Sequence, residues 1–458
     1  MRVTENGDWV RQQFEACEFG DERRRKRVLR MALNMLNCPD QSLPTQSESW
    51  SDLKAAYRWC DCDQVTFDAV ASSHWEQTRD TKPGRYLLIS DTTDIDHFNH
   101  KATTGLSFLG SGTGYGMQLH SCLMVDASKK QVVGIAGALL NYRQKMPPGE
   151  SRTARLKRAR ESLIWGNVVQ QMGPPPEGSQ WIHVFDRGGD NYEAMCHLVL
   201  NRGDWIIRAG RLNRNVVDIN GKTLPLGDAI SNVSLLGHYE LSLRARPRHQ
   251  TRVAQIEVST CRVRFPQPHF RSEFVKDSGV ESIDMNVVIV QELNPPKGIK
   301  AIRWVLLTSL ESDTFDAAWE VIEHYETRWL IEEYHKVLKT GCQVERHALR
   351  EASRLEPLTA LTSVIAVRLL QLKTISKSDP DQPAQRRVPR SWLDALKGLR
   401  PRIKKTQLTV YTFFRELAKL GGFLGRTHDR EPGWQTIWRG YQKLHAVLLG
   451  IEIAKRSG

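Results

Sequence analysis

The sequence predicts an α/β protein with a helical region at each end of the chain and a β-rich insertion in the middle. Apolar strand-like runs alternate with helical patterns between residues 85 and 202, as in compact α/β domains. Successive strand-like runs with few helical signals follow between residues 204 and 310. The regions before residue 76 and after residue 375 show mainly helical patterns.

The composition indicates a basic globular protein. The chain has 458 residues, of which 40% are hydrophobic and 26% charged, and its formal net charge is +13. This length predicts more than one domain, and the positive charge predicts a polyanionic partner, nucleic acid before membrane. We expect no secretion signal, because the first residues include acidic side chains and no apolar stretch. The eight cysteines include no pairs at zinc spacing, so we expect an intracellular, reduced protein without a structural metal.

Residues 1–75 are predicted to form a helical domain. The segment "GDERRRKRVLRMALNMLN" begins a helix at Asp21, and "SWSDLKAAYRWC" predicts a second, shorter helix. The first helix carries a dense basic cluster: Arg23, Arg24, Arg25, Lys26, Arg27 and Arg30. Such a cluster either contacts DNA phosphates or forms an ordinary solvated face, and the sequence leaves both interpretations open.

Residues 76–375 are predicted to form the α/β domain, interrupted by the β-rich insertion at about 204–310. Short apolar runs bounded by turn residues predict four strands, and two segments after the third predict helices. The strands are "RYLLIS" (85–90), "QLHSCLMVDA" (118–127), "QVVGIAGALL" (131–140) and "WIHVFD" (181–186), and the helices are 154–172 and 191–202. After the insertion, "YETRWLIEEYHKVLKTG" (325–341) predicts one helix, and the apolar run at 358–372 predicts a buried one.

Residues 376–458 are predicted to form a helical C-terminal domain for dimerisation. A polar, proline-bearing linker, "KSDPDQPAQRRVPR" (377–390), precedes a helical region that begins at Trp392. Apolar residues at steps of four, three and three then form a stripe on one helix face: Trp434, Trp438, Tyr441 and Leu444. This stripe either pairs two protomers or packs inside the chain, and the sequence leaves both open.

The predicted helix at 325–341 has one unusual face. At about 100° per residue, four of its side chains fall within roughly 60° of one another: Tyr325, Arg328, Glu332 and Lys339. Leu330, Tyr334 and Val337 project from the other side and can face a core. Taken alone, the polar face is also what a solvated helix shows. His335 and Lys336 have an ordinary surface interpretation.

Carboxylates stand at the ends of two predicted strands. Asp91 follows the first strand in "LLISDTT", and Asp186 ends the fourth in "HVFDRGGD". Adjacent strands that end this way can present both acids at one sheet edge, and Glu332 could complete the cluster. Three carboxylates suit hard divalent cations such as Mg²⁺, and two such ions can hold the attacking and leaving oxygens of a phosphodiester. Each aspartate could instead be an ordinary turn residue.

Four segments, "SDTT", "FDRGGD", "YETRWLIEEYHKVLKTG" and "VIAVRLLQL", together resemble the DDE transposases of bacterial insertion sequences. The similarity is to the insertion-sequence-four family in its transposon-five-like branch, which carries a Tyr-(2)-Arg-(3)-Glu-(6)-Lys signature and a β insertion. The resemblance covers nearly the whole chain and implies an RNase H-like catalytic core. The sequence departs from the family after Asp186, where Gly188 and Gly189 replace the frequent acidic-alanine pair.

The resemblance also implies the site residues and the cofactor. Asp91, Asp186 and Glu332 would be the catalytic acids and would hold two Mg²⁺ (or Mn²⁺) ions per active site. Nearby acids off the motif positions are weaker candidates: Asp94, Asp96 and Glu333. DNA near the cut would contact Tyr325, Arg328, Lys339, Arg208 and Trp304, and the basic cluster Arg24, Arg25, Lys26, Arg27 and Arg30 would contact the DNA ends. Trp304 would stack on a flipped base, although a tryptophan in a strand-like run is also an ordinary core residue.

The implied activity is cut-and-paste transposition. The protein would bind double-stranded DNA at the ends of its mobile element as a homodimer, cut through a hairpin intermediate, and join the ends to target DNA. We expect a cytoplasmic, nucleoid-associated protein without membrane contact. Two alternatives remain. A stand-alone RNase H-like metal-dependent nuclease would cleave without joining, and a non-catalytic transposase-derived inhibitor would bind DNA without cleaving it.

Overall fold

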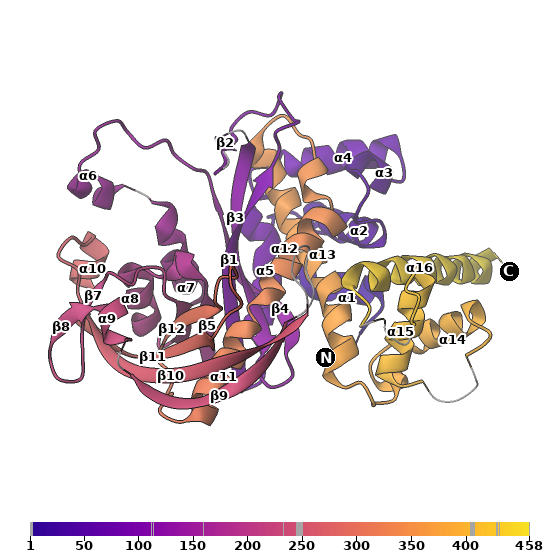
Figure 1. Ribbon diagram of the computed structural model, residues 1–458. Helices are drawn as coiled ribbons and strands as arrows, with labels where there is room; N and C mark the ends of the chain where they lie inside the picture. Colours follow the sequence, from indigo (N-terminus) through magenta and orange to yellow (C-terminus); the bar gives the residue numbers. More distant parts are fainter. Residues whose placement is uncertain are drawn as a thin grey trace.

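The computed structural model describes residues 3–110, 112, 114–158, 160–231, 233–243, 251–403, 408–426, 429 and 431–457. Two predicted segments therefore lie partly outside the described residues: the strand at 238–247 and the C-terminal stretch at 421–450. The architecture is mixed α/β, with one large mixed sheet and helices at both ends of the chain (Figure 1). The coarse fold class predicted from the sequence is confirmed at this level.

One sheet runs through the molecule. Its strands lie in the order β2-β3-β1-β5-β6-β12-β11-β10-β7-β8, with β4 beside β3 and β9 beside β10. The strand bounds are β1 (Arg85–Asp96), β2 (Ser107–Phe108), β3 (Tyr115–Asp126), β4 (Gln131–Asn141), β5 (Gln180–Phe185), β6 (Asp204–Arg208), β7 (Asn215–Val217), β8 (Thr223–Pro225), β9 (Ser234–Leu243), β10 (Arg252–Pro266), β11 (Ser282–Leu293) and β12 (Arg303–Thr308).

Strand β1 lies between antiparallel and parallel neighbours. It pairs antiparallel with β3, which pairs antiparallel with β4, and on its other side it pairs parallel with β5. The last parallel pair of β1 and β5 joins Ile89 to Val184. Asp91 and Asp186 each come two residues later, so the register brings them to equivalent positions at one edge of this pairing. Parallel strands carry their C-terminal ends to the same side of a sheet.

The first predicted strand was too short. We expected it to end at Ser90, but β1 continues to Asp96 because its pairing with β3 continues, and Asp91 lies opposite Ser121 within that ladder.

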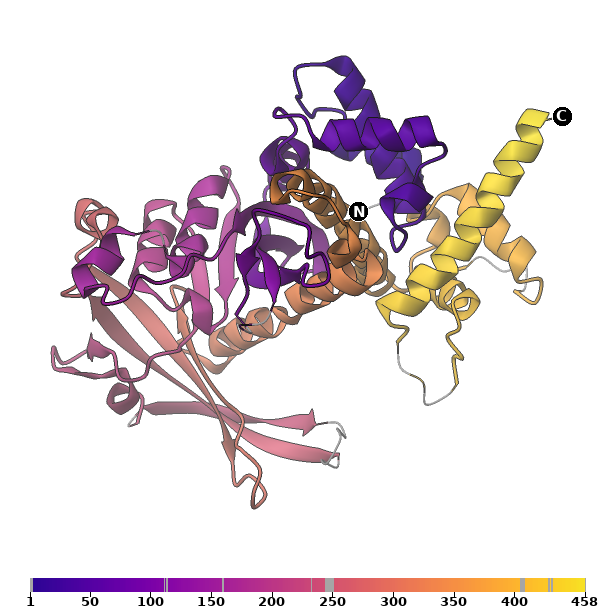
Figure 2. The same cartoon turned by 90° about the horizontal axis from the view of Figure 1, so that it is seen from above.

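The strand β6 also differs from its prediction. It pairs parallel with β5, so it belongs to the same sheet as the α/β segment, although the sequence placed it in the insertion. The long strands β9, β10 and β11 then curve away from β1 (Figure 2).

The N-terminal region is helical, as predicted. It comprises α1 (Asn6–Phe14), α2 (Glu22–Asn37), α3 (Leu43–Gln46), α4 (Trp50–Cys60) and α5 (Phe67–Arg79). Asp21 precedes α2 as its N-cap, and its side chain accepts a hydrogen bond from the Arg23 amide, which satisfies one of the free N–H groups of the first turn. Helix α5 packs against α1, α13 and β4.

Two predicted helices are divided in the structure. The helix expected at 154–172 is a short helix, a 3₁₀ turn and a second helix, and the helix expected at 325–341 is broken at Thr327–Arg328 and ends in a π-helical turn, Val337–Gly341. The helices of this part of the chain are α6 (Arg152–Lys157), α7 (Ile164–Met172), α8 (Tyr192–Leu200), α9 (Leu226–Ala229), α10 (Glu273–Asp277), α11 (Phe315–Glu326), α12 (Trp329–Lys336) and α13 (Ala352–Ser378).

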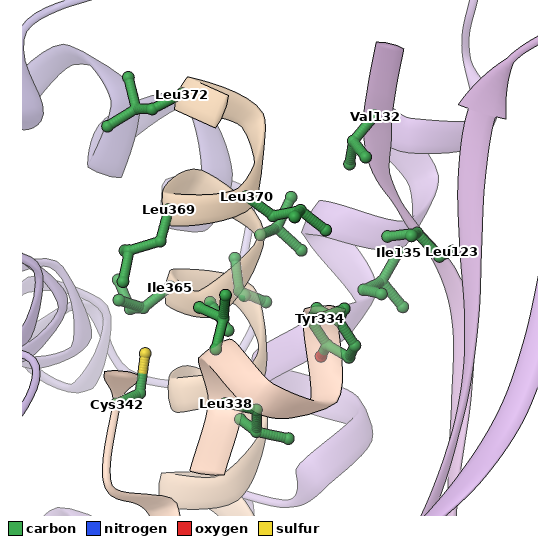
Figure 3. Close-up of a cluster of buried hydrophobic side chains, with 14 of the residues drawn as sticks. Leu123, Val132, Ile135, Tyr334, Leu338, Cys342, Ile365, Leu369, Leu370 and Leu372 are labelled. Atoms are coloured by element: carbon green, nitrogen blue, oxygen red, sulfur yellow. The ribbon is translucent and has the colours of Figure 1, made fainter. Parts of the chain in front are cut away.

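Helix α13 is the centre of the packing. It contacts α2, α4, α5, α12, α15, α16 and β4. Tyr334 and Leu338, which follow Glu332 in the chain, lie among side chains of α13, β3 and β4 (Figure 3). The helix is long and apolar enough to cross a membrane, but 94% of its apolar window is buried inside the molecule. This is the environment of a core helix, as predicted, and it is consistent with a soluble protein.

The C-terminal region differs from its prediction at the linker, and its apolar stripe follows one of the two interpretations that the sequence left open. Residues 379–389, expected to be a linker, are packed: Ala384 and Val388 are buried, and the Ala384 amide donates to the Leu408 carbonyl. The apolar stripe beginning at Trp434 packs inside the chain, and Tyr441 donates to Asn6 of the N-terminal region. The helices are α14 (Arg390–Leu399), α15 (Val410–Leu420) and α16 (Trp434–Ser457).

Arg368 joins the N-terminal region to α13. It is 1% exposed, its Nη2 donates to the Thr4 carbonyl at 2.5 Å, and its guanidinium lies 5.5 Å from the centre of the Trp9 ring. Burial lowers its pKa to about 10. The group is thus a charged side chain whose stabilising contacts come from the N-terminal segment.

We predict that Arg368→Ala destabilises the protein by about 3 kcal/mol, because it leaves a cavity and removes the donor to Thr4. Arg368→Met should cost less, since methionine refills most of the volume. Calorimetric melting of the full chain measures both. The exposed Arg350→Ala serves as the control, and an unchanged Tm for Arg368→Ala would contradict the role given to this residue.

Candidate active site

Asp91 projects from β1 into a partly buried position. Its Oδ1 accepts a hydrogen bond from the Thr92 amide at 2.8 Å, and its Oδ2 lies 3.0 Å from Arg328 Nη1. The side chain is 15% exposed. Asp91 is therefore held by its own strand on one oxygen and by a guanidinium on the other.

Asp186 caps the 3₁₀ turn that follows β5. Its Oδ1 accepts from the Gly188 amide at 2.7 Å. A Cβ at position 188 would lie 2.7 Å from Trp165 and 3.0 Å from Asp186 Oδ1, and one at position 189 would lie 2.6 Å from Phe185. Both glycines therefore lie in close packing that leaves no room for a side chain in this turn.

Arg328 joins Asp91 to Glu332. Its Nη2 lies 3.2 Å from Glu332 Oε1, while Nη1 pairs with Asp91. The break between α11 and α12 falls at Thr327–Arg328, so Arg328 stands at the N-cap of α12 and Glu332 one turn later. Because residues four apart share a helix face, both side chains point toward the end of β1.

The three acids act on one another electrostatically. The pKa of Asp91 is raised to about 6, chiefly by burial and then by the negative charges of Asp186 and Glu332, while the Thr92 amide and Arg328 oppose the rise. Asp91 and Asp186 also line the same cavity of about 730 Å³. The structure therefore brings the predicted acids together from two strands and a helix.

Asp91 and Glu332 also lie beside His335. One oxygen of each carboxylate and one ring nitrogen of His335 lie within 4.8 Å of one another, and Asp186 does not join this group. His335 is 7% exposed and its pKa is lowered to about 3, chiefly by burial. The surface interpretation of His335 from the sequence is wrong, whereas Lys336 is exposed as expected.

Tyr325, Arg208 and Trp304 meet beside the acids. The Tyr325 and Trp304 rings are in edge contact with centroids 5.2 Å apart, and Tyr325 is 5% exposed. Burial raises the pKa of Tyr325, while Arg328 and a hydrogen bond with Arg208 oppose the rise. Trp304 is half-buried, and both Arg208 and Trp304 line a pocket of about 480 Å³ that also contains Arg187, Lys300 and Arg303. Trp304 is thus accessible from this basic pocket.

Lys339 lies on the π-helical turn after α12. Its Nζ is 3.3 Å from Glu345 Oε1, and its charge acts on His335. The residues predicted to share one helix face therefore come from three pieces of structure: the end of α11, the start of α12 and a π turn. Such π turns often occur at functional sites.

The larger cavity has acids at one end and arginines around the rest. Arg143, Arg155 and Arg160 line it together with Asp91 and Asp186. Arg143 pairs with Glu161 at 2.7 Å and Arg160 with Glu193 at 2.6 Å, while Arg155 is exposed. These arginines were not predicted as site residues, because Arg155 and Arg160 fall in the predicted helix at 154–172 and Arg143 lies between predicted elements.

The weaker acidic candidates have partners of their own. Asp94 accepts a hydrogen bond from Gln118 at 3.0 Å, Asp96 accepts one from the Phe98 amide at 2.8 Å, and Glu333 pairs with Lys373. None of them belongs to the group formed by Asp91, Glu332 and His335.

Acidic neighbours neutralise much of the N-terminal basic cluster. Arg23 pairs with Asp21 at 2.8 Å and Arg30 with Glu48 at 2.7 Å. Arg25 and Arg27 pair with Glu22 and Asp52, and Arg24 donates to the Phe19 carbonyl at 2.6 Å. Lys26 is exposed, and no ion pair is recorded for it among the residues the structure describes. The cluster contributes less free positive charge than its sequence suggests.

Residues 6–65 match a family described as transposase DNA-binding. The matched segment runs from the first residue of α1 through α4 and includes the whole basic cluster. The match supports a transposase that binds DNA through its N-terminal region, and it makes DNA a partner of this protein.

We predict that Lys26→Ala weakens binding of terminal DNA, because an exposed lysine can contact a phosphate directly. The slope of the logarithm of the binding constant against the logarithm of the salt concentration should fall by about one. Arg27→Ala should mainly lower the Tm, since Asp52 is 6% exposed and would keep only Arg30, at 3.3 Å. Salt titrations of DNA binding and thermal melting of each variant test both expectations. The reverse pattern, with Arg27 controlling the salt slope and Lys26 without effect, would contradict them.

Proposed function

We propose that this protein is a cut-and-paste DDE transposase of the insertion-sequence-four, transposon-five-like type, with an RNase H-like catalytic core. The observation that carries the proposal is the convergence of Asp91, Asp186 and Glu332 in a chain whose residues 6–65 match a transposase DNA-binding family. The strand order β4-β3-β1-β5-β6, with two antiparallel and two parallel pairings, supports the RNase H-like part.

The residues present fit a divalent cation site. Asp91, Asp186 and Glu332 would hold Mg²⁺ or Mn²⁺, because carboxylate oxygens are the ligands such cations prefer. Bound cations would activate the attacking hydroxyl or water and stabilise the leaving oxygen of the phosphodiester. Arg328 positions two of these carboxylates by pairing with both, and the Gly188 amide fixes the third.

Positively charged side chains around the acids would place the DNA. The arginine-lined cavity next to Asp91 and Asp186 suits a phosphate backbone. On the other side, the pocket with Arg208 and Trp304 offers cations beside an aromatic face, which suits a phosphate and an unstacked base. Correct placement of the scissile phosphate would supply a large part of the rate enhancement.

Cutting both strands and joining the ends would require two protomers on two DNA ends. Because the stripe beginning at Trp434 is buried within the chain, we place the pairing surface on the later part of α16, which projects from the body of the molecule (Figure 2). Leu449 is 40% exposed there. This placement keeps the proposed homodimer but moves its contact away from the predicted stripe.

The catalytic assignment predicts that Asp91→Asn, Asp186→Asn and Glu332→Gln each abolish strand cleavage and leave end binding intact. Each substitution keeps the side-chain size and removes the charge that would hold the cation. Gel-shift and cleavage assays on the same terminal DNA with Mg²⁺ measure the two activities. The matched control is Asp94→Asn on the same strand, which should cleave normally. Cleavage at the wild-type rate by Glu332→Gln would remove the assignment.

Trp304 yields a separate prediction about the hairpin step. Trp304→Ala should nick the first strand at nearly the normal rate and then stall, because the bent strand loses an aromatic surface worth roughly 1–3 kcal/mol of stacking. Sequencing gels resolve nicked and hairpin products. Trp319→Ala, which removes a tryptophan stacked on Phe315, controls for a general loss of packing and should not stall at the nick. Hairpins formed at the wild-type rate by Trp304→Ala would make Trp304 an ordinary structural residue.

A further inference from the structure

His335 lies on the same face of α12 as Glu332 and turns toward the acids. The two residues have the spacing Glu-x-x-His, and this i, i+3 spacing projects both ligands of carboxylate-bridged metal centres from one helix face. One ring nitrogen of His335 lies within 4.8 Å of a carboxylate oxygen of Asp91 and of Glu332. No other group of three such side chains this close is found among the residues the structure describes.

One ring nitrogen of His335 also lacks a hydrogen-bond partner. His335 is 7% exposed, and its Nε2 is buried without a hydrogen-bond partner. Buried polar atoms without partners are rare because they cost free energy. The neighbouring His120 also has a buried Nε2 without a partner, but its Nδ1 is 2.7 Å from Thr92 Oγ1 and it does not belong to the group with Asp91 and Glu332.

We infer that His335 is an additional ligand, through nitrogen, of the divalent cation held by Asp91 and Glu332. This inference rests on the proposed function, because it completes the cation site assigned there. Its consequence is a change in metal preference. Imidazole nitrogen binds transition metals such as Mn²⁺ better than it binds Mg²⁺, whereas an all-carboxylate site favours the harder ions. The site should therefore prefer Mn²⁺ over Mg²⁺ by more than its carboxylates alone would give.

The test is direct measurement of Mn²⁺ binding to the full chain without DNA. Titrations followed by electron paramagnetic resonance give the Kd for Mn²⁺, and competition with Mg²⁺ gives the preference between the ions. His335→Ala should weaken Mn²⁺ binding by about tenfold or more, since even the loss of an outer partner of a metal ligand costs about 10–100-fold. Mg²⁺ binding should weaken less, so the preference for Mn²⁺ should fall.

Two further variants distinguish the loss of a metal ligand from a general loss of folding. His335→Gln retains a polar side chain that can offer a carbonyl oxygen, so it should keep part of the Mn²⁺ affinity and lose the preference over Mg²⁺. His324→Gln is the matched control, because His324 is also a buried histidine without hydrogen-bond partners, on the preceding helix α11. It should bind both ions as the wild type does.

The outcomes separate this inference from the proposed function. If wild type binds Mn²⁺, Glu332→Gln loses it, and both His335 variants keep wild-type affinity and preference, the inference about His335 is overturned and the acid site stands. If the wild type binds no Mn²⁺, or if Glu332→Gln binds it as tightly as the wild type, the cation site itself and the inference both fail. Reduced Mn²⁺ preference in both His335 variants, with His324→Gln unchanged, supports the assignment.

Discussion

The two ion pairs of Arg328 connect the sheet to helix α12, and the geometry of the candidate site depends on them. Arg328 and Asp91 are 237 positions apart in the chain, yet their side chains are 3.0 Å apart. The same guanidinium reaches Glu332 at 3.2 Å. The Arg328 and Asp91 side chains are 18% and 15% exposed, so their pair is less screened by solvent than a surface pair, whereas Glu332 is 41% exposed. Without the positive charge of the Arg328 guanidinium between them, the carboxylates of Asp91 and Glu332 would repel each other.

The position of Arg328 follows from the interruption between α11 and α12. Helix α11 ends at Glu326 with Thr327 as its C-cap, the Thr327 hydroxyl donates to the Glu323 carbonyl at 2.9 Å, and α12 begins at Trp329. Tyr325 therefore turns inward against Trp304, while Arg328 and Glu332 face β1. On the opposite face of α12, the Tyr334 hydroxyl donates to the Ser363 carbonyl of α13 at 3.2 Å. Packing of the apolar face against the core thus orients the polar face of α12 (Figure 3).

Local patterns predicted the elements well and their connections less well. Asp21 and Ser49 start helices where the capping pattern indicated, and the position of Asp186 after its strand is as expected. The extent of β1 was missed because strand ends depend on pairing with β3, which residue type does not encode. The packing of 379–389 was missed for the same reason, because its contacts, such as that of Ala384 with Leu408, come from distant parts of the chain. For the stripe at Trp434 the sequence left packing inside the chain and pairing of protomers open, and the contact of Tyr441 with Asn6 belongs to the first of these. His335 could have been found from the Glu-x-x-His spacing, but its burial required the fold.

The packing around α13 also bears on how DNA binding and the acid site are related. Helices α2 and α4, within the segment that matches the transposase DNA-binding family, pack on α13, and so does α12. One buried helix therefore supports both the segment that matches the DNA-binding family and the helix that carries Glu332. The distribution of positive charge also concerns both regions. Acidic side chains pair with four of the six basic residues on α2, whereas exposed Arg155 lines the cavity beside Asp91. Exposed positive charge, which attracts a phosphate backbone, is therefore present beside Asp91 as well as at Lys26 of α2.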